Sequence, residues 1–115
     1  MERNFKTING KTYEFVCNYW ETRNAWGHEC SLFEEERYTR TSYARARYYN
    51  RTWESYPYQT VMMGAVNNEL ERVKERVIDE WKYINNKKRI TKTQKEQLWA
   101  NCERIKELNE LYNSL

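Results

Sequence analysis

The chain has 115 residues, a length that fits one domain and leaves little room for a second. Lys and Arg (20) nearly balance Asp and Glu (17), and the formal charge of +3 is too small for a domain that follows a nucleic-acid backbone. We therefore expect no sequence-specific binding of duplex DNA. Aliphatic residues are few, so 10 Tyr, 5 Trp and 3 Phe must supply most of the bulk of a small core.

Two strands joined by a tight turn are predicted at the N-terminus. Asn9-Gly10 is a strong signal for a two-residue hairpin, here between strands over Phe5–Ile8 and Lys11–Thr22. The longer strand alternates in character, which places its apolar side chains on one face. These side chains are Tyr13, Phe15, Cys17 and Tyr19.

Two more strands are predicted after a turn at Asn24–Gly27. The first covers His28–Glu35, and the second covers about Ser42–Trp53. The second strand alternates again. Ala44, Ala46 and Tyr48 face one way, and Tyr43, Arg45, Arg47 and Tyr49 face the other.

Helical periodicity begins near Pro57, which suits a first helical turn. One helix is predicted over residues 58–84 and a second over 93–113, with a polar run at Asn85–Arg89 between them. Thr91 with Gln94, or Thr93 with Glu96, can form a capping box for the second helix. The apolar stripes are Val66, Leu70, Val73, Val77, Trp81 and Ile84 in the first helix, and Leu98, Cys102, Ile105, Leu108, Tyr112 and Leu115 in the second.

This order of elements predicts an α+β fold. An N-terminal antiparallel sheet of three or four strands is followed by an antiparallel hairpin of two helices. We expect a single domain over residues 1–115, with a β-rich part (1–56) and a helical part (57–115). The small core and the long apolar stripes favour a homo-oligomer.

The composition argues against catalysis. His28 is the only histidine, Asp79 is the only aspartate, and the three glycines are scattered. These counts leave no transition-metal cluster, no local support for a Ser-His-Asp triad and no glycine-rich phosphate loop. We therefore predict that the protein is not an enzyme and that it has no catalytic residues, no metal site and no cofactor.

Cysteine usage and hydropathy indicate the compartment. Cys17, Cys30 and Cys102 are widely spaced and odd in number, which favours reduced thiols over a disulfide framework. The sequence contains neither an apolar run of membrane-spanning length nor the core of a signal peptide. We expect a cytoplasmic protein that does not bind membranes.

Arginine and tyrosine alternate between Arg37 and Arg51, a stretch that holds five arginines and no acidic residue. Guanidinium groups bind phosphate and stack on rings, and aromatic rings accept bases by stacking. The pattern favours a ligand that carries a phosphate and a base. A solvated strand face, whose arginines pair with Glu34–Glu36, accounts for it as well.

Other candidate residues lie at the predicted junctions. Arg51 and Trp53 precede the first helix, whose N-terminus offers N–H groups to an anion, although Trp53 could instead pack the junction. Asn86 lies in the loop between the helices, where an asparagine commonly ends a helix. Arg104 lies on the second helix, either beside a pocket or in solvent.

The run Asn-Arg-Thr-Trp-Glu (50–54) with Tyr-Gln-Thr-Val (58–61) resembles small proteins of phages and low-GC Gram-positive bacteria. In length, element order and the placement of Arg51, Asn86 and Arg104, the chain is similar to the Thoeris anti-defence sponge family. Members of that family sequester cyclic ADP-ribose-type signals made by TIR-domain defence enzymes.

The resemblance implies a phage-type protein in the host cytoplasm that binds a small anionic cyclic nucleotide without cleaving it. The ligand-binding residues would be Arg45, Arg47, Arg51, Trp53, Asn86 and Arg104. The alternative is a protein–protein inhibitor of a host defence complex, as an anti-CRISPR protein is of a Cas nuclease. Arginines that meet in one cleft beside an aromatic ring would favour the sponge, and a flat face of mixed charge would favour the inhibitor.

Overall fold

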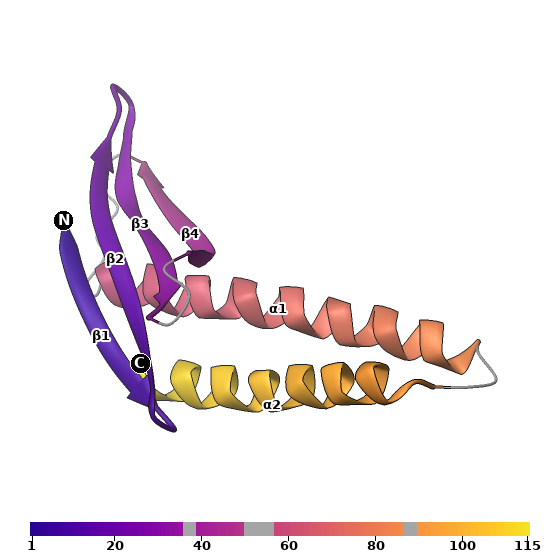
Figure 1. Ribbon diagram of the computed structural model, residues 1–115. Coiled ribbons are helices and arrows are strands. Elements are labelled where there is room, and N and C mark those ends of the chain that lie inside the picture. The colour runs from indigo at the N-terminus through magenta and orange to yellow at the C-terminus, as the bar shows by residue number, and fades with distance from the viewer. Residues whose placement is uncertain (36–38, 50–56, 87–89) are drawn as a thin grey trace.

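Four strands precede two helices in the computed structural model, which describes residues 1–35, 39–49, 57–86 and 90–115 (Figure 1). The elements are β1 (Glu2–Ile8), β2 (Lys11–Glu21), β3 (Ala25–Glu34), β4 (Arg40–Tyr49), α1 (Pro57–Asn85) and α2 (Lys92–Ser114). The strands form one antiparallel sheet in the order β1-β2-β3-β4. The predicted α+β fold, with a sheet followed by a helical hairpin, is confirmed.

The first predicted turn is correct and the second is displaced. Asn9 (φ 51°) and Gly10 (φ 80°) both adopt the left-handed conformation that a two-residue hairpin requires. The second turn was predicted at Asn24–Gly27, but β3 already begins at Ala25. Thr22 closes this turn, because its N–H and its hydroxyl both donate to the carbonyl oxygen of Ala25, at 2.8 and 3.1 Å.

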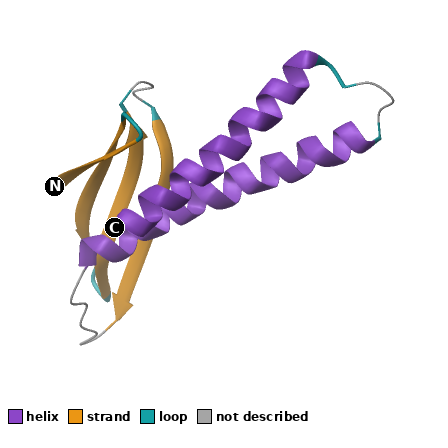
Figure 2. Ribbon diagram, turned by 90° about the horizontal axis from the view of Figure 1, so that it is seen from below, coloured by secondary structure: helices purple, strands orange, loops and turns teal. Residues whose placement is uncertain are grey.

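Both helices pack on one face of the sheet, which we call the inner face (Figure 2). Helix α1 crosses β4 and β3, and α2 reaches β1. The alternation predicted for β2 is confirmed for Tyr13, Phe15 and Cys17, all fully buried here, whereas Tyr19 is half exposed. The rest of the core is Cys30, Leu32, Val61, Met62, Ala65, Val66, Leu70, Val73, Leu108 and Leu111.

The hydroxyl of buried Tyr13 donates a hydrogen bond to the carboxylate of Glu107, which also pairs with Lys11. Burial of the phenol, the hydrogen bond and the negative charge of Glu107 raise the pKa of Tyr13 above its ordinary value. Only the protonated phenol can donate this bond, so the contact depends on Tyr13 keeping its proton.

We expect the free energy of unfolding to fall less steeply with pH, above pH 10, in Tyr13→Phe than in the wild type. Above the ordinary tyrosine pKa of about 10, the unfolded chain loses the Tyr13 proton while the folded chain keeps it. The folded state then binds one proton more than the unfolded state. Tyr13 therefore makes the free energy of unfolding fall by about 1.4 kcal/mol per pH unit. Urea unfolding at several pH values above 10 should give a slope that is shallower by this amount in Tyr13→Phe, and equal slopes in the two proteins would contradict the assignment.

The contact between the two helices includes a polar pair where an apolar one was predicted. Trp81 is 55% exposed and Cys102 is exposed, so both were placed wrongly in the buried stripes. Their chain neighbours Glu80 and Asn101 turn inward instead, and the Asn101 amide donates to the Glu80 carboxylate at 3.0 Å. The buried stripe is therefore shifted by one residue at this level of the hairpin.

Helix α2 begins at the predicted capping box. The side chain of Thr91 accepts a bond from the N–H of Gln94, and the side chain of Gln94 accepts one from the N–H of Thr91. Of the two candidates in the sequence, the chain uses Thr91 with Gln94, and α2 therefore begins at Lys92.

Candidate binding surface

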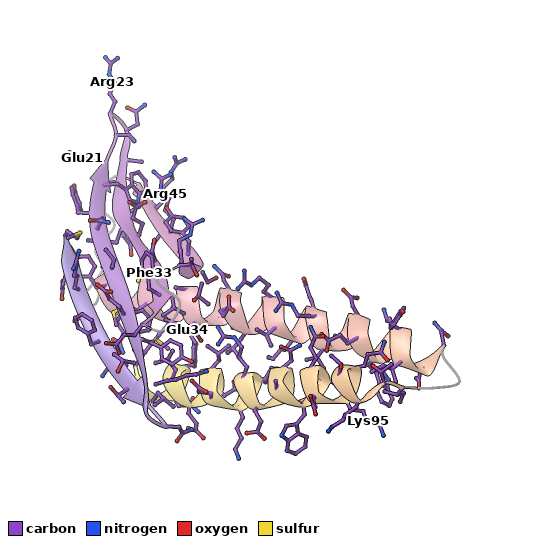
Figure 3. All side chains as sticks on the ribbon, viewed as in Figure 1. Glu21, Arg23, Phe33, Glu34, Arg45 and Lys95 are labelled. Carbon is purple, nitrogen blue, oxygen red and sulfur yellow. The ribbon has the colours of Figure 1, made fainter. Side chains whose placement is uncertain are left out.

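The sheet face opposite the helices, which we call the outer face, carries arginines and aromatic rings. Because side chains alternate along a strand, residues that neighbour the buried ones point to this face. Figure 3 labels two of them, Arg45 on β4 and Phe33 on β3. Neither described helix packs against this face (Figures 1 and 2).

Trp20, Arg45 and Arg47 form what we call the arginine–tryptophan cluster. The guanidinium carbon of Arg45 lies 3.9 Å from the centre of the Trp20 ring, and that of Arg47 lies at 5.6 Å. The indole N–H donates to the carbonyl oxygen of His28 and fixes the ring across β3. The cluster therefore presents two guanidinium groups side by side on a rigid aromatic support.

The Trp20 ring can lie flat on the sheet because its cross-strand neighbour is Gly27. A Cβ atom at Gly27 would lie 2.8 Å from the ring and 2.0 Å from the carbonyl oxygen of Ala46. Only glycine fits here, because the Trp20 ring and the Ala46 carbonyl oxygen both lie too close for a side chain. This close approach explains a glycine inside a strand, where the sequence had predicted a turn.

The cluster continues along β4 with charges of both signs. Glu29 pairs in register with Arg45 and accepts a 2.6 Å hydrogen bond from the Tyr43 hydroxyl. Burial and the bond to Glu29 raise the pKa of Tyr43. The guanidinium of Arg40 lies 5.5 Å from the centre of the Tyr43 ring. This part of the outer face is a nearly continuous strip of arginines, rings and one carboxylate.

A groove of mixed character occupies the other half of the outer face. It has a volume of about 380 Å³, and Phe5, Val16 and Phe33 form its apolar lining. Its polar lining is Arg3, Thr12, Glu14, Glu34 and Glu35, and Arg3 pairs with Glu14 at 3.5 Å. Phe5 is 61% exposed, so the groove offers apolar surface to a partner.

Arg104, a predicted ligand-binding residue, lies instead in a buried cluster of charges. Its guanidinium donates to Glu34 at the end of β3 and, at 3.1 Å, to Glu69 on α1. Only 11% of its side chain is exposed, with 6% for Glu34 and 1% for Glu69. Burial by itself lowers the pKa of Arg104. The bonds to Glu34 and Glu69 have the larger, opposite effect, so the pKa is raised overall and the guanidinium stays charged. Arg104 is therefore buried in an ion-pair cluster and not in the solvent position considered from the sequence, and its part in ligand binding stays a prediction.

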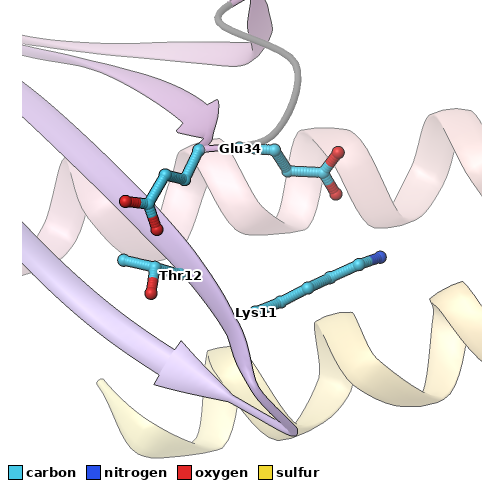
Figure 4. Close-up of a pocket in the computed structure, with 4 residues that line it drawn as sticks. Lys11, Thr12 and Glu34 are labelled. Atoms are coloured by element: carbon cyan, nitrogen blue, oxygen red, sulfur yellow. The ribbon is translucent and has the colours of Figure 1, made fainter.

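A small cavity adjoins this charge cluster where β2 begins and β3 ends. Lys11, Thr12, Glu34 and Glu35 line it, as Figure 4 shows. Its volume of about 10 Å³ is at the lower limit for one water molecule, so it cannot hold a nucleotide.

The predicted site residues are not all brought together. Arg45 and Arg47 lie side by side, whereas Asn86 follows the end of α1 at the far tip of the hairpin. Figure 3 shows that Arg45 and Lys95, near that tip, lie at opposite ends of the molecule. Arg51 and Trp53 lie outside the described residues.

An aromatic cluster around His28 was not predicted. The rings of Tyr19, Trp26, Tyr48 and Tyr58 surround the imidazole, with centroid distances of 5.0 to 6.0 Å. His28 is 7% exposed and lies on the inner face with Trp26, whereas Trp20 lies on the outer face. Trp20 and Trp26, which flank the turn between β2 and β3, therefore lie on opposite faces of the sheet.

Comparison of the chain with protein-family models, curated proteins and solved structures found no match. Within residues 1–35, 39–49, 57–86 and 90–115, no three His, Cys, Asp or Glu side chains are grouped to hold a metal ion. Neither α1 nor α2, as far as they are described, is long and apolar enough to cross a membrane.

Proposed function

We propose that the chain is a binding protein without catalytic activity, and that it docks a protein partner on the outer face of its sheet. The observation that supports this most directly is the exposure of Arg45 and Arg47, which lie beside Glu29 on a sheet face that neither α1 nor α2, as described, packs against. Among the described residues, the predicted arginines do not converge in one cleft. Trp, Tyr and Arg, the residue types of this face, are also those enriched at the energetic centres of protein interfaces.

The charges and the groove define the chemistry of the partner. The described outer face carries four arginines against three glutamates, Glu14, Glu29 and Glu35. The excess of positive charge lies along β4, so this part of the face complements a surface that carries carboxylates. The groove beside Phe5 and Phe33 accepts an apolar side chain. The resemblance to anti-defence proteins supports a protein of a host defence complex, such as a Cas nuclease, as the partner. Covering that surface would inhibit the complex.

The double variant Arg45→Glu/Arg47→Glu tests this proposal against purified Cas nucleases and other defence proteins. The wild-type chain should bind and inhibit one of them, and the double variant should bind at least about tenfold more weakly, because interface arginines are often worth 2 kcal/mol or more. Arg76→Glu/Lys92→Glu changes the net charge equally at exposed helical positions and should retain binding. Undiminished binding by the outer-face variant would contradict the proposal.

Sequestration of a cyclic nucleotide is the second candidate, and the stacking of Arg45 on Trp20 favours it. A guanidinium held flat on an indole, with a second guanidinium close by, suits a ligand that has both a phosphate and a base. In this form of the hypothesis Trp20 takes the supporting role that the sequence suggested for Trp53.

Thermal unfolding with a panel of cyclic ADP-ribose isomers and cyclic oligonucleotides separates the two candidates. A sponge is stabilised by about 2.7 kcal/mol when its ligand is present at 100 times Kd, and the ligand should be recovered intact after heating. If no member of the panel changes the melting temperature, the sponge hypothesis fails and the protein partner remains.

A further inference from the structure

Two buried cysteines lie opposite each other on neighbouring strands. Cys17 on β2 and Cys30 on β3 are paired in register, and both side chains are fully buried on the inner face of the sheet. The third cysteine, Cys102, is exposed on α2. All three are free thiols in this structure. Two cysteines that are widely spaced in the sequence are therefore direct neighbours in the fold.

The backbone bonds of the β2–β3 ladder determine how closely the two cysteines approach. Hydrogen-bonded pairs alternate along an antiparallel ladder with non-hydrogen-bonded pairs, whose Cα atoms are closer, at about 4.5 Å. At each end of this ladder, a backbone N–H donates to the carbonyl oxygen of the residue directly opposite. These bonds run from Glu35 to Thr12 and from Thr22 to Ala25. Steps of two from either bond pass over Cys17, so Cys17 and Cys30 form a non-hydrogen-bonded pair.

A pair of this type has the geometry that a disulfide needs. The Cα atoms of disulfide-bonded cysteines are between about 4.4 and 6.8 Å apart, a range that includes the spacing of a non-hydrogen-bonded pair. Opposed residues also point to the same face of a sheet. A hydrogen bond between the two thiols lowers the pKa of Cys17, and the same bond together with burial raises the pKa of Cys30. Cys17 is therefore the thiol that ionises first.

We propose that Cys17 and Cys30 are a redox-active dithiol, which a small-molecule disulfide such as oxidised glutathione converts to a disulfide between β2 and β3. The Cys17 thiolate attacks one sulfur of the small disulfide, forms a mixed disulfide and releases the first thiol. The Cys30 sulfur then gives up its proton, attacks the Cys17 sulfur and displaces the second thiol. Two electrons pass from the protein to the small disulfide, and the two cysteine protons leave on its two thiol products.

The oxidant reaches the pair from the free edge of the sheet. The second cross-strand neighbour of Cys17 is Glu2, the exposed first residue of the edge strand β1. The end of such a strand opens at a lower free-energy cost than the core. On the other side, Cys30 pairs with Ala44, which α1 covers, since a Cβ atom at Gly64 would lie 3.1 Å from that of Ala44. Opening of β1 therefore exposes Cys17 first, the thiol that begins the exchange.

Equilibration in a glutathione buffer tests the proposal in the folded chain. Cys102→Ser removes the exposed thiol and leaves the buried pair intact. In a mixture of reduced and oxidised glutathione, this protein should lose both thiols together, with a mass lower by two hydrogen atoms, and dithiothreitol should restore them. Trypsin should release the peptide Thr12–Arg23 joined to Asn24–Arg37. Retention of both thiols in oxidised glutathione alone, or glutathione left on one cysteine as the main product, would overturn the proposal.

Two additions separate slow access from the absence of a site. A sample oxidised in urea and then returned to the same buffer should reach the same ratio of disulfide to dithiol, because the equilibrium does not depend on the route. A ratio that returns to the dithiol alone would contradict the proposal. Cys30→Ala/Cys102→Ser, which keeps only the Cys17 thiol, is the matched control and should form no internal disulfide.

Urea unfolding gives a second measurement that does not depend on counting thiols. The oxidised Cys102→Ser protein should unfold at a higher urea concentration than the reduced one, because the link restricts the unfolded chain. Dithiothreitol should remove this difference and should leave the midpoint of Cys30→Ala/Cys102→Ser unchanged. A midpoint that is no higher in the oxidised protein would show that the native strand pairing does not accommodate the bond, and would contradict the proposal.

Discussion

Replacing Arg104 with methionine is expected to lower the free energy of unfolding by about 3–5 kcal/mol, the cost of removing one member of a buried ion pair. The change takes the guanidinium away from Glu34 and Glu69, whose side chains are 6% and 1% exposed. Arg72 still reaches Glu69, but it lies in solvent and cannot neutralise Glu34 as well. Native domains are stable by only about 5–15 kcal/mol in total, so the loss is about a fifth of the total stability or more.

Urea unfolding measures this effect, with two comparisons. Arg76→Met removes an exposed guanidinium of α1 and should change stability by no more than about 0.5 kcal/mol. Glu34→Leu/Glu69→Met/Arg104→Met removes the cluster as a whole and should recover most of the loss, because apolar packing often replaces a buried charge cluster without cost. A loss below about 1 kcal/mol in Arg104→Met would show that Arg104 contributes little to the free energy of unfolding and would contradict the prediction.

Gly27→Ala is expected to cost about 3 kcal/mol or more, the upper range for a core that is overpacked. The added Cβ would lie 2.0 Å from the Ala46 carbonyl oxygen, so β3 and β4 would have to separate. It would also lift the Trp20 ring at 2.8 Å and disturb the support of Arg45 and Arg47. The variant should therefore lose outer-face binding together with stability.

Gly64→Ala is the matched control in α1. Its Cβ would lie 3.1 Å from the Cβ of Ala44, a contact that a small shift of the helix relieves, and alanine gains about 1 kcal/mol of helix propensity over glycine. The net change measured by urea unfolding should stay within about 1 kcal/mol. Equal stabilities of Gly27→Ala and the wild type would contradict the role assigned to Gly27.

The elements of this fold were predictable because their signals are local. Alternation in Lys11–Glu21, the Asn9-Gly10 turn and the Thr91–Gln94 capping box each involve residues only a few positions apart. Gly27 was wrongly predicted to lie in a turn. A local sequence cannot distinguish a turn glycine from a strand glycine that lies beneath a ring, because the pairing of Gly27 with Trp20 depends on strand register. Trp81 and Cys102 were misread because their neighbours Glu80 and Asn101 could satisfy each other only after the hairpin had formed.

The candidate site was predictable only in part, for the same reason. The alternation of arginine and tyrosine placed Arg45 and Arg47 correctly on one strand face. Their support by Trp20 depends on the register of three strands, and no short pattern carries that information. Arg104 binds residues that are 70 and 35 positions away, so nothing near it in the sequence indicates that it is buried.

The bonds of Arg104 also determine when a newly made chain can reach its native packing. During synthesis the sheet and α1 emerge before residue 104, at about 5–20 residues per second. In that interval the guanidinium that binds Glu34 and Glu69 is absent, and so are Leu108 and Leu111 of the core. The first ninety residues therefore stay short of their native arrangement until α2 has been made, and α2 then completes the packing around strands that were made first.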